Sequence, residues 1–121
     1  MVAVWGPIGS PGRTTVAIGL ADEASRLGVS TLLIDADTYG PSIAQRLGLL
    51  SDTSGLAAAC RLAGQGRLDA AALHRVSVML PSGFTVVTGL PRAAGWEELR
   101  PSALDAVVET ARSAHTLTVV D

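Results

Sequence analysis

The chain has 121 residues, of which 48% are hydrophobic, so it can form one modest domain with a core and is too short for two. Its nine basic residues are all arginines, and eleven acidic residues are spread along the chain with them, giving a net charge of −2. This balance shows neither a basic patch that would indicate a nucleic-acid surface nor an acidic tail.

The single cysteine, Cys60, excludes an intramolecular disulfide and a Cys-x-x-Cys metal or cluster site in this sequence. Cys60 lies among alanines in a predicted helix, so we expect a small buried hydrophobic residue rather than a nucleophile. There is no signal-peptide pattern, and no apolar run approaches the ~18 residues of a membrane span. We therefore expect a cytoplasmic protein without a transmembrane segment.

The first elements follow from the hydrophobic pattern. Residues 2–5 form an apolar run closed by Gly6 and Pro7, which predicts a strand buried on both faces. Residues 14–27 have helical spacing, and Gly28 follows at a position typical of a helix C-terminus. The apolar residues that recur with this spacing are Val16, Leu20, Ala24 and Leu27. With a second buried strand at 31–34, the pattern predicts a right-handed βαβ unit.

Strands and helices alternate in the rest of the chain. We predict short helices at 42–47, 55–62 and 68–74, strands at 84–88 and 116–121, and a helix within 96–113 that begins near Pro101. This order predicts an α/β fold, a mostly parallel, doubly wound sheet with helices on both faces. Because the last strand reaches Asp121 with no helix after it, we expect residues 1–121 to be one domain that is an N-terminal part of a longer fold.

The stretch GPIGSPGRTT, residues 6–15, joins the first strand to the first helix. A phosphate-binding P-loop aims backbone N–H groups and the helix dipole at an anion and places a hydroxyl for Mg²⁺ at the helix start. Gly12, Arg13, Thr14 and Thr15 fit that description. The strict motif is not met, because its first glycine falls on Pro7 and its lysine on Arg13.

Two other interpretations of the same stretch stay open. Gly6, Gly9 and Gly12 form a loose version of the dinucleotide-binding fingerprint, with Asp35 available for a ribose hydroxyl. An arginine and two threonines at the helix start speak against it, because that fold places small or apolar residues there. The stretch could also be a plain connection, although its glycines and prolines exceed what a connection needs.

The stretch GPIGSPGRTTVAIGLADEASRLGVSTLLIDADTYGPSIAQRLGL, residues 6–49, resembles the first third of the MinD/ParA superfamily of deviant-Walker P-loop ATPases. It is most similar to the CpaE/TadZ-like branch, which is associated with pilus assembly and polar positioning. IDADTYGPS, residues 34–42, is also similar to the Mrp/Nbp35 iron–sulfur carriers, which depend on a Cys-x-x-C pair that this sequence lacks.

The loop departs from the pattern of this superfamily, in which lysine, two glycines, any residue, glycine, lysine and Ser or Thr follow one another. Those positions read Ile8, Gly9, Ser10, Pro11, Gly12, Arg13 and Thr14. Ile8 cannot make the signature lysine's contact across an ATP-bound dimer, and Pro11 lacks an N–H donor. Arg13 keeps the charge but not the geometry of lysine. These changes predict weakened nucleotide binding and slow hydrolysis.

The resemblance implies roles for individual residues. It assigns phosphate binding to a set at the loop and helix start, namely Gly9, Ser10, Gly12, Arg13, Thr14 and Thr15. It assigns Mg²⁺ to the Thr14 hydroxyl and, through water, to Asp35 and Asp121, and it gives Asp37 the orientation of the attacking water. The alternatives are that Thr14 and Thr15 only cap the helix and that Asp37 is a solvated turn carboxylate.

These residues lead to three functional expectations. The first is an ATP-binding domain, magnesium-dependent and weakly hydrolytic if active, that dimerises and serves the positioning or assembly of a larger complex with an unidentified protein partner. The second is a pseudo-ATPase scaffold, favoured by Ile8, Pro11 and Arg13. The third is an NAD(P)-binding oxidoreductase domain. Outside the loop, we expect His74 and His115 at the surface or at helix ends and Trp5 and Trp96 in packing, Trp96 alternatively facing a partner.

Overall fold

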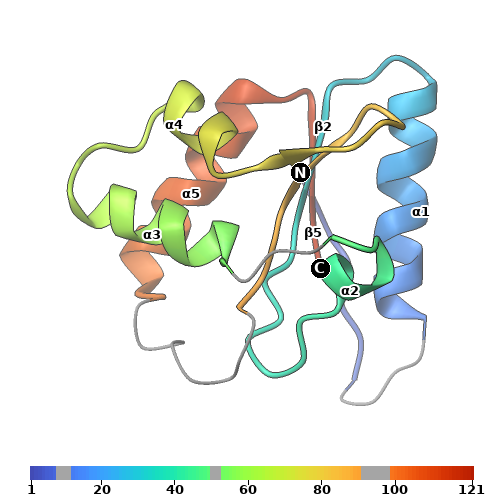
Figure 1. Ribbon diagram of the computed structural model, residues 1–121, viewed down its shortest axis with the longest axis horizontal. Coiled ribbons are helices and arrows are strands. Elements are labelled where there is room, and N and C mark those ends of the chain that lie inside the picture. Colours follow the sequence, from blue (N-terminus) through green and yellow to red (C-terminus); the bar gives the residue numbers. More distant parts are fainter. Residues whose placement is uncertain (8–11, 50–52, 91–98) are drawn as a thin grey trace.

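The computed structural model describes residues 1–7, 12–49, 53–90 and 99–121. A five-stranded sheet has the order β1-β5-β2-β4-β3. Strands β1 (Val2–Ala3), β5 (Leu117–Val120), β2 (Thr31–Ile34) and β4 (Thr85–Val87) are parallel, and β3 (Val78–Met79) is antiparallel to β4. Figure 1 shows their arrangement. The expected α/β fold with a mostly parallel sheet is confirmed.

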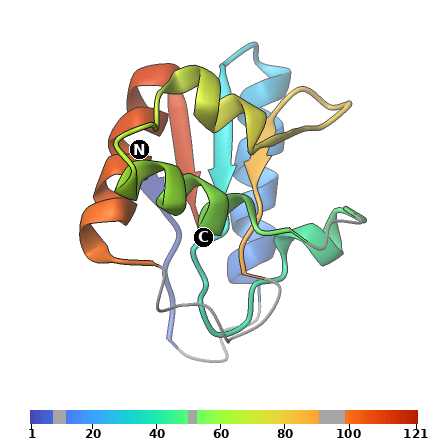
Figure 2. The same ribbon diagram turned by 60° about the vertical axis from the view of Figure 1, so that its left-hand side comes forward.

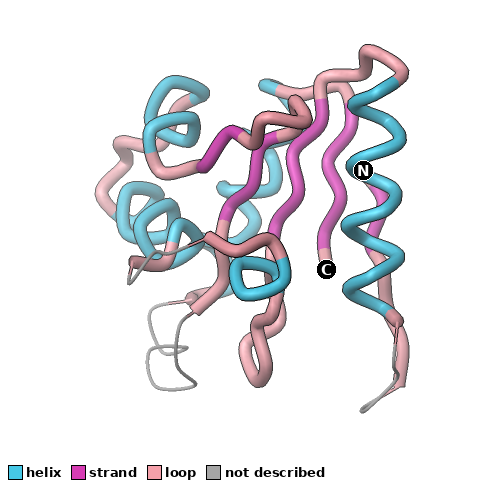
Figure 3. Tube along the Cα trace, turned by 45° about the vertical axis from the view of Figure 1, so that its right-hand side comes forward, coloured by secondary structure: helices cyan, strands magenta, loops and turns pink. Residues whose placement is uncertain are grey.

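Helices cover both faces of the sheet, as expected. Helix α1 (Arg13–Arg26) and the short α2 (Ile43–Arg46) lie on one face, while α3 (Gly55–Gly64), α4 (Ala70–Arg75) and α5 (Pro101–Ala114) group on the other (Figure 1, Figure 2). The strands lie side by side between the two groups (Figure 3). No helix in the described ranges has the length and apolar character needed to span a membrane.

The core divides into two clusters because successive strand residues point to opposite faces. In β2, Leu33 packs with α1, whereas Leu32 and Ile34 pack with α3 and α5. Cys60 is buried in the cluster that contains Leu32 and Ile34, as predicted. The strand β2 is buried along its whole length, and its predicted bounds are confirmed.

Local sequence signals set most helix ends. After α1, Gly28 takes φ +83°, its N–H donates to the Ser25 carbonyl at 2.9 Å, and the Val29 N–H donates to Ala24 at 3.0 Å. This is a Schellman motif, and it satisfies carbonyls that the helix end leaves free. Ser54 and Asp69 cap α3 and α4 through their side chains, and Pro101 occupies the first turn of α5.

The buried face of α1 differs from the one that its large apolar residues indicate. Thr14, Ala17 and Ala21 are buried against the sheet, while Val16 is 60% exposed and Leu27 is 81% exposed. Small side chains let the helix lie close to β2 and β5, which it contacts. Residue size therefore decides which face of α1 is buried.

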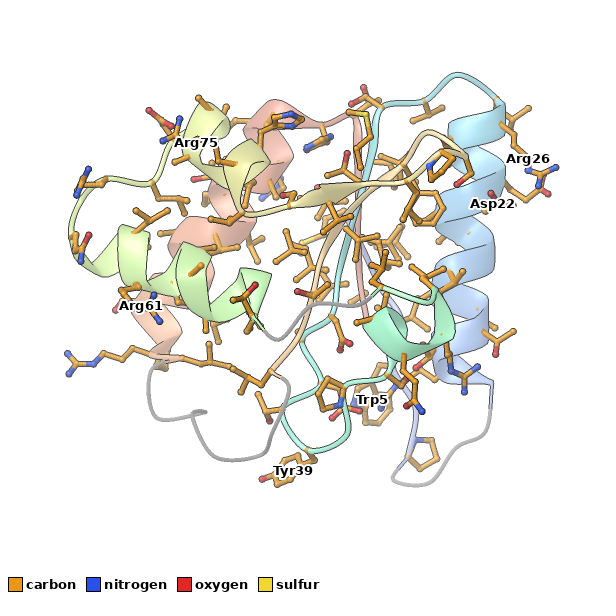
Figure 4. All side chains as sticks on the ribbon, viewed as in Figure 1. Trp5, Asp22, Arg26, Tyr39, Arg61 and Arg75 are labelled. Atoms are coloured by element: carbon orange, nitrogen blue, oxygen red, sulfur yellow. The ribbon has the colours of Figure 1, made fainter. Side chains whose placement is uncertain are left out.

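Two further expectations near the N-terminus are wrong. Strand β1 is not buried on both faces; it is one of the two edge strands of the described sheet, and both of its residues are exposed. Trp5 is not a packing residue, because it is 87% exposed and lies at the end of the sheet where the parallel strands stop (Figure 4). Trp96 lies outside the described residues.

The antiparallel strand β3 was not predicted. It forms a hairpin with β4, closed by Leu80 N–H donating to the Phe84 carbonyl at 2.9 Å, with Gly83 at φ +110° in the turn. His74 is exposed in the last turn of α4, and His115 is half-buried just after α5, as expected for helix-end histidines.

Candidate functional site

The candidate site lies where the parallel strands end and α1 begins, toward the bottom of Figure 1. Gly12 stands immediately before α1 with φ +95°, a left-handed conformation that favours glycine. Arg13 and Thr14 follow in the first turn. The predicted phosphate residues Gly9 and Ser10, with Ile8 and Pro11, lie outside the described residues.

Thr14 connects the first helix to the last strand. It is buried, and its hydroxyl donates to Oδ2 of Asp121 at 2.8 Å. The Ser42 hydroxyl, just before α2, donates in turn to Thr14 Oγ1 at 3.3 Å. Three segments that are distant in the sequence thus meet at one hydroxyl.

Arg13 lies between two carboxylates. Its Nη2 is 2.5 Å from Oδ2 of Asp37, and its Nε is 3.3 Å from Oδ1 of Asp121. Both atoms of the second contact are buried, and neither has a hydrogen-bond partner among the described residues. This contact is therefore an ion pair that is not aligned as a hydrogen bond. The positive charge of Arg13 is therefore committed to the acids of the site.

Asp37 is held in a turn after β2. Its Oδ1 accepts the backbone N–H groups of Tyr39 at 2.9 Å and Gly40 at 3.0 Å, and its Oδ2 accepts from Arg13. Partial burial acts to raise the pKa of Asp37, but these N–H donors and the Arg13 guanidinium outweigh it and lower the pKa. The carboxylate is consequently ionised at neutral pH.

Asp35, directly after β2, is almost fully buried. Its Oδ2 accepts from Ile43 N–H at 3.1 Å and its Oδ1 from Asp37 N–H at 3.3 Å. Its pKa is raised to about 6, chiefly by burial and also by the charges of Asp121 and Asp37, against the lowering by these two hydrogen bonds. Asp35 therefore orders the start of α2 and the turn that carries Asp37.

Thr15 is not part of this cluster. It is exposed, and its Oγ1 accepts from Arg46 Nη1 of α2 at 2.7 Å. The described residues of the predicted site that come together are Arg13, Thr14, Asp35, Asp37 and Asp121.

Sequence reasoning missed two contributors to the site. Ser42 was considered only as a turn residue and as the first residue of the predicted helix at 42–47, and not as a site residue, although a serine at the start of a short helix is a typical cap and could have drawn attention. Gly89 was not considered; a Cβ there would lie 2.9 Å from Cγ of Asp35 and 2.8 Å from Cβ of Pro41, so the Asp35 site requires glycine at that position. No local signal in the sequence identifies such a long-range approach.

A cavity of ≈ 300 Å³ opens beside Arg13. Its lining comprises Ala3, Val4, Trp5, Arg13, Ala36, Asp37, Thr38, Tyr39, Val120 and Asp121. Trp5 and Tyr39 are both highly exposed at this end of the molecule (Figure 4). Within the described ranges, no group of three or more His, Cys, Asp or Glu side chains is arranged to hold a metal ion by itself.

The chain is similar to known proteins in part of its sequence and in its fold. No protein-family model matches the chain. Over 49 residues, 40% of the chain, it is 45% identical to the iron-sulfur cluster carrier protein of Aquifex aeolicus, and that match covers 14% of the carrier.

Solved structures match nearly the whole chain, with 99% coverage in each case. They include the kinase domain of Escherichia coli tyrosine kinase ETK (24% identity, TM-score 0.77) and the Pyrococcus furiosus cell division ATPase MinD (17%, 0.77). A third is cobyrinic acid a,c-diamide synthase from Mycobacterium smegmatis with bound ADP and magnesium (19%, 0.75). The chain has the fold of the MinD/ParA-type P-loop ATPases. It spans 45% to 49% of the length of these solved chains.

The MinD/ParA-type fold explains why the predicted residues converge. In a parallel sheet the carboxyl ends of neighbouring strands meet at one edge, and β1, β5 and β2 are neighbours. The start of α1, Asp121 after β5 and Asp35 after β2 are thereby brought to the same place. The likenesses do not distinguish the CpaE/TadZ-like branch from others of this fold.

Proposed function

We propose that this chain is a nucleotide-binding domain of the MinD/ParA type that takes ATP with Mg²⁺ at the start of α1. The observation that carries the proposal is the 2.8 Å contact between the Thr14 hydroxyl and the Asp121 carboxylate. A hydroxyl at the first turn of the helix and an acid at the end of a neighbouring strand are the groups that hold Mg²⁺ in P-loop ATPases. The chain brings them together from its two ends.

The phosphates would be bound by the residues that open α1. Gly12 turns the chain into the helix, whose free N–H groups and dipole favour an anion. Arg13 supplies a positive charge at the same place. Gly9, Ser10 and Thr15 complete the proposed set.

The residues present fit magnesium, which prefers oxygen ligands. Thr14 and Asp121 offer a hydroxyl and a carboxylate, and Asp121 Oδ1 is a buried acceptor that has no hydrogen-bond partner in the part of the chain that the structure describes. Each oxygen of Asp35 accepts one N–H and keeps a second lone pair, so Asp35 can hold a water. Bound magnesium would neutralise charge on the phosphates.

We expect hydrolysis to be slow. Asp37 is the residue proposed to orient the attacking water, and in this structure its Oδ2 is paired with Arg13. The carboxylate can orient water only after that pair opens. We infer that the domain is chiefly a nucleotide binder, acting as a cytoplasmic homodimer in the positioning or assembly of a larger complex of the CpaE/TadZ kind.

A scaffold without nucleotide chemistry is the second candidate. It is favoured by the same Arg13 contacts, because a guanidinium committed to two carboxylates is not free to bind phosphate. The exposed Trp5 and Tyr39 would then serve protein contacts.

Calorimetric titration with a non-hydrolysable ATP analogue, with and without Mg²⁺, separates the two. Circular dichroism first establishes that the chain is folded. Removing one hydrogen bond to a charged group costs ~1.5–3 kcal/mol, so we expect Thr14→Ala and Arg13→Ala to weaken binding by roughly ten- to a hundred-fold. Arg26→Ala is the matched control, because Arg26 pairs with Asp22 at the far end of the same helix (Figure 4).

Magnesium-dependent binding that is lost in the first two variants and kept in the control supports the ATP-binding proposal. A folded chain that binds no analogue in either condition contradicts it and supports the scaffold. Magnesium-independent binding of NAD(P) in place of ATP would contradict both.

A further inference from the structure

The acids of the site already have a cation, and it is a side chain of the same chain. Arg13 contacts Asp37 at 2.5 Å and Asp121 at 3.3 Å. The Arg13 side chain is about three-quarters buried, and that of Asp121 is 1% exposed. A charge in this position is screened by solvent less than a charge at the surface, so both carboxylates lie within its reach.

The contact between Arg13 and Asp121 is an ion pair without a hydrogen bond. Arg13 Nε and Asp121 Oδ1 face each other at 3.3 Å, yet neither makes a hydrogen bond among the described residues. A buried donor and a buried acceptor left without partners are unfavourable, and both would gain from a better partner. For Nε such a partner is an anionic oxygen, and for Oδ1 it is a cation or a water bound to one.

Both better partners belong to the proposed ligand. Arg13 is the first residue of α1, so a polyphosphate at the helix start offers oxygens to the same guanidinium. When Arg13 moves to the phosphates, Asp37 and Asp121 lose their counter-charge. While Arg13 stays, a divalent cation approaching Asp121 meets a positive charge.

We propose that the Arg13 guanidinium occupies the position of a metal ion and keeps divalent metal ions away from Asp121 and Asp37. When a polyphosphate binds, Arg13 pairs with the phosphate oxygens instead and leaves the two carboxylates. The phosphate-dependent half of this inference rests on the proposed function; the exclusion of the metal ion does not. The consequence is an order of events in which anion binding precedes or accompanies cation binding and never follows it.

The exclusion is tested with Mn²⁺ alone, by the loss of the free-ion electron paramagnetic resonance signal during titration of the folded chain. Arg13→Gln removes the charge, Arg13→Lys keeps it, and Arg26→Gln removes an arginine at the far end of α1. We expect Arg13→Gln to bind Mn²⁺ at least about ten-fold more tightly than the wild type. Arg13→Lys and Arg26→Gln should behave as the wild type does.

Equal Mn²⁺ affinity in the wild type and Arg13→Gln, whether measurable or undetectable, overturns the exclusion. A gain that also appears in Arg13→Lys overturns it as well, because the charge would not be the cause. Circular dichroism of each variant accompanies the titration.

The order of events is tested with every residue of the described site intact, so it does not depend on the folding of an Arg13 variant. In Trp96→Phe, Trp5 is the only tryptophan, and it lines the cavity beside Arg13. Its fluorescence is followed during titration with the non-hydrolysable ATP analogue in EDTA and in Mg²⁺. Calorimetry under the same conditions measures binding independently of the probe.

Binding of the analogue in EDTA, tightened by Mg²⁺, supports the proposed order. Binding in Mg²⁺ with none in EDTA overturns the order while the proposed function stands. No binding in either condition overturns the proposed function and the phosphate step with it, while the Mn²⁺ titration still decides whether Arg13 excludes the metal ion.

Discussion

The hydroxyl of Thr14 and the carboxylate of Asp121, from the first helix and the end of the last strand, share a buried hydrogen bond of 2.8 Å. Thr14→Val keeps the shape of the side chain and leaves Asp121 Oδ2 without this donor. An unsatisfied buried acceptor costs about 1–3 kcal/mol, so we expect the free energy of unfolding in urea to fall by that amount.

The neighbouring threonine is the control for this change. Thr15 is exposed, and its contact with Arg46 is at the surface. Thr15→Val should change the free energy of unfolding by less than about 0.5 kcal/mol. Equal effects of the two substitutions would show that the Thr14–Asp121 bond does not stabilise the fold.

Gly89 is expected to tolerate no side chain. A Cβ at this position would lie 2.8 Å from Cβ of Pro41 and 2.9 Å from Cγ of Asp35, so either the turn or the carboxylate must shift. Overpacking of this kind typically costs about 1–3 kcal/mol. Thermal unfolding of Gly89→Ala should show a lower Tm than the wild type.

Gly19→Ala is the matched control for that substitution. Gly19 lies within α1, and a Cβ there would meet no atom within 4 Å. Replacing an exposed helical glycine by alanine should stabilise the chain by about 0.5–1 kcal/mol. A raised Tm in both variants would contradict the crowding at Gly89.

The raised pKa of Asp35 predicts that the free energy of unfolding increases on mild acidification. Its folded pKa is raised from 3.8 to about 6, so between these values the folded state binds a proton that the unfolded state does not. As the pH falls through this window, Asp35 contributes up to about 3 kcal/mol of added stability. Urea unfolding of the wild type and Asp35→Asn at several pH values measures it; Asp35→Asn should lose this rise.

Asp37 acts in the opposite direction at lower pH. Its folded pKa is lowered below 3.8, so its contribution is present above that value and is lost as the pH falls further through the folded pKa. Asp37→Asn should therefore remove part of the acid destabilisation below about pH 4. If the free energy of unfolding of Asp37→Asn fell below about pH 4 as it does in the wild type, the contacts of Asp37 with Arg13 and with the N–H groups of the turn would not favour the ionised form of Asp37.

The orientation of α1 can be tested by a pair of adjacent substitutions. Val16 is exposed and Ala17 is fully buried against the sheet. Val16→Ala should be nearly neutral, whereas Ala17→Leu should cost about 1–3 kcal/mol or more through overpacking. The opposite result in denaturant unfolding would mean that the large apolar residues form the buried face after all.

Much of the fold could be predicted because its signals are local. The strand at 31–34 is a continuous buried run, and Gly28 ends α1 through a motif that four neighbouring residues define. The buried face of α1 could not be predicted from such local signals. Alanine and valine are both apolar, and only the closeness of the sheet decides that Ala17 and Ala21 face it.

The site was predictable in outline and not in its contacts. Parallel topology alone brings Thr14, Asp35 and Asp121 to one edge of the sheet. The pairing of Arg13 with Asp37 joins residues 24 positions apart and depends on side-chain geometry that no local pattern records. The short hairpin strand Val78–Met79 was missed because two residues carry no periodicity.

The pairing of β1 with β5 has a consequence for how the protein is made. Residue 2 lies beside residue 119, and among the described strands β5 is the neighbour of β1. Strand β1 therefore lacks its neighbour in the described sheet until β5 has been synthesised. Such long-range pairing slows folding, so the nascent chain exposes the apolar segment of β1 until β5 has been made, and chaperones have access to that segment in the meantime.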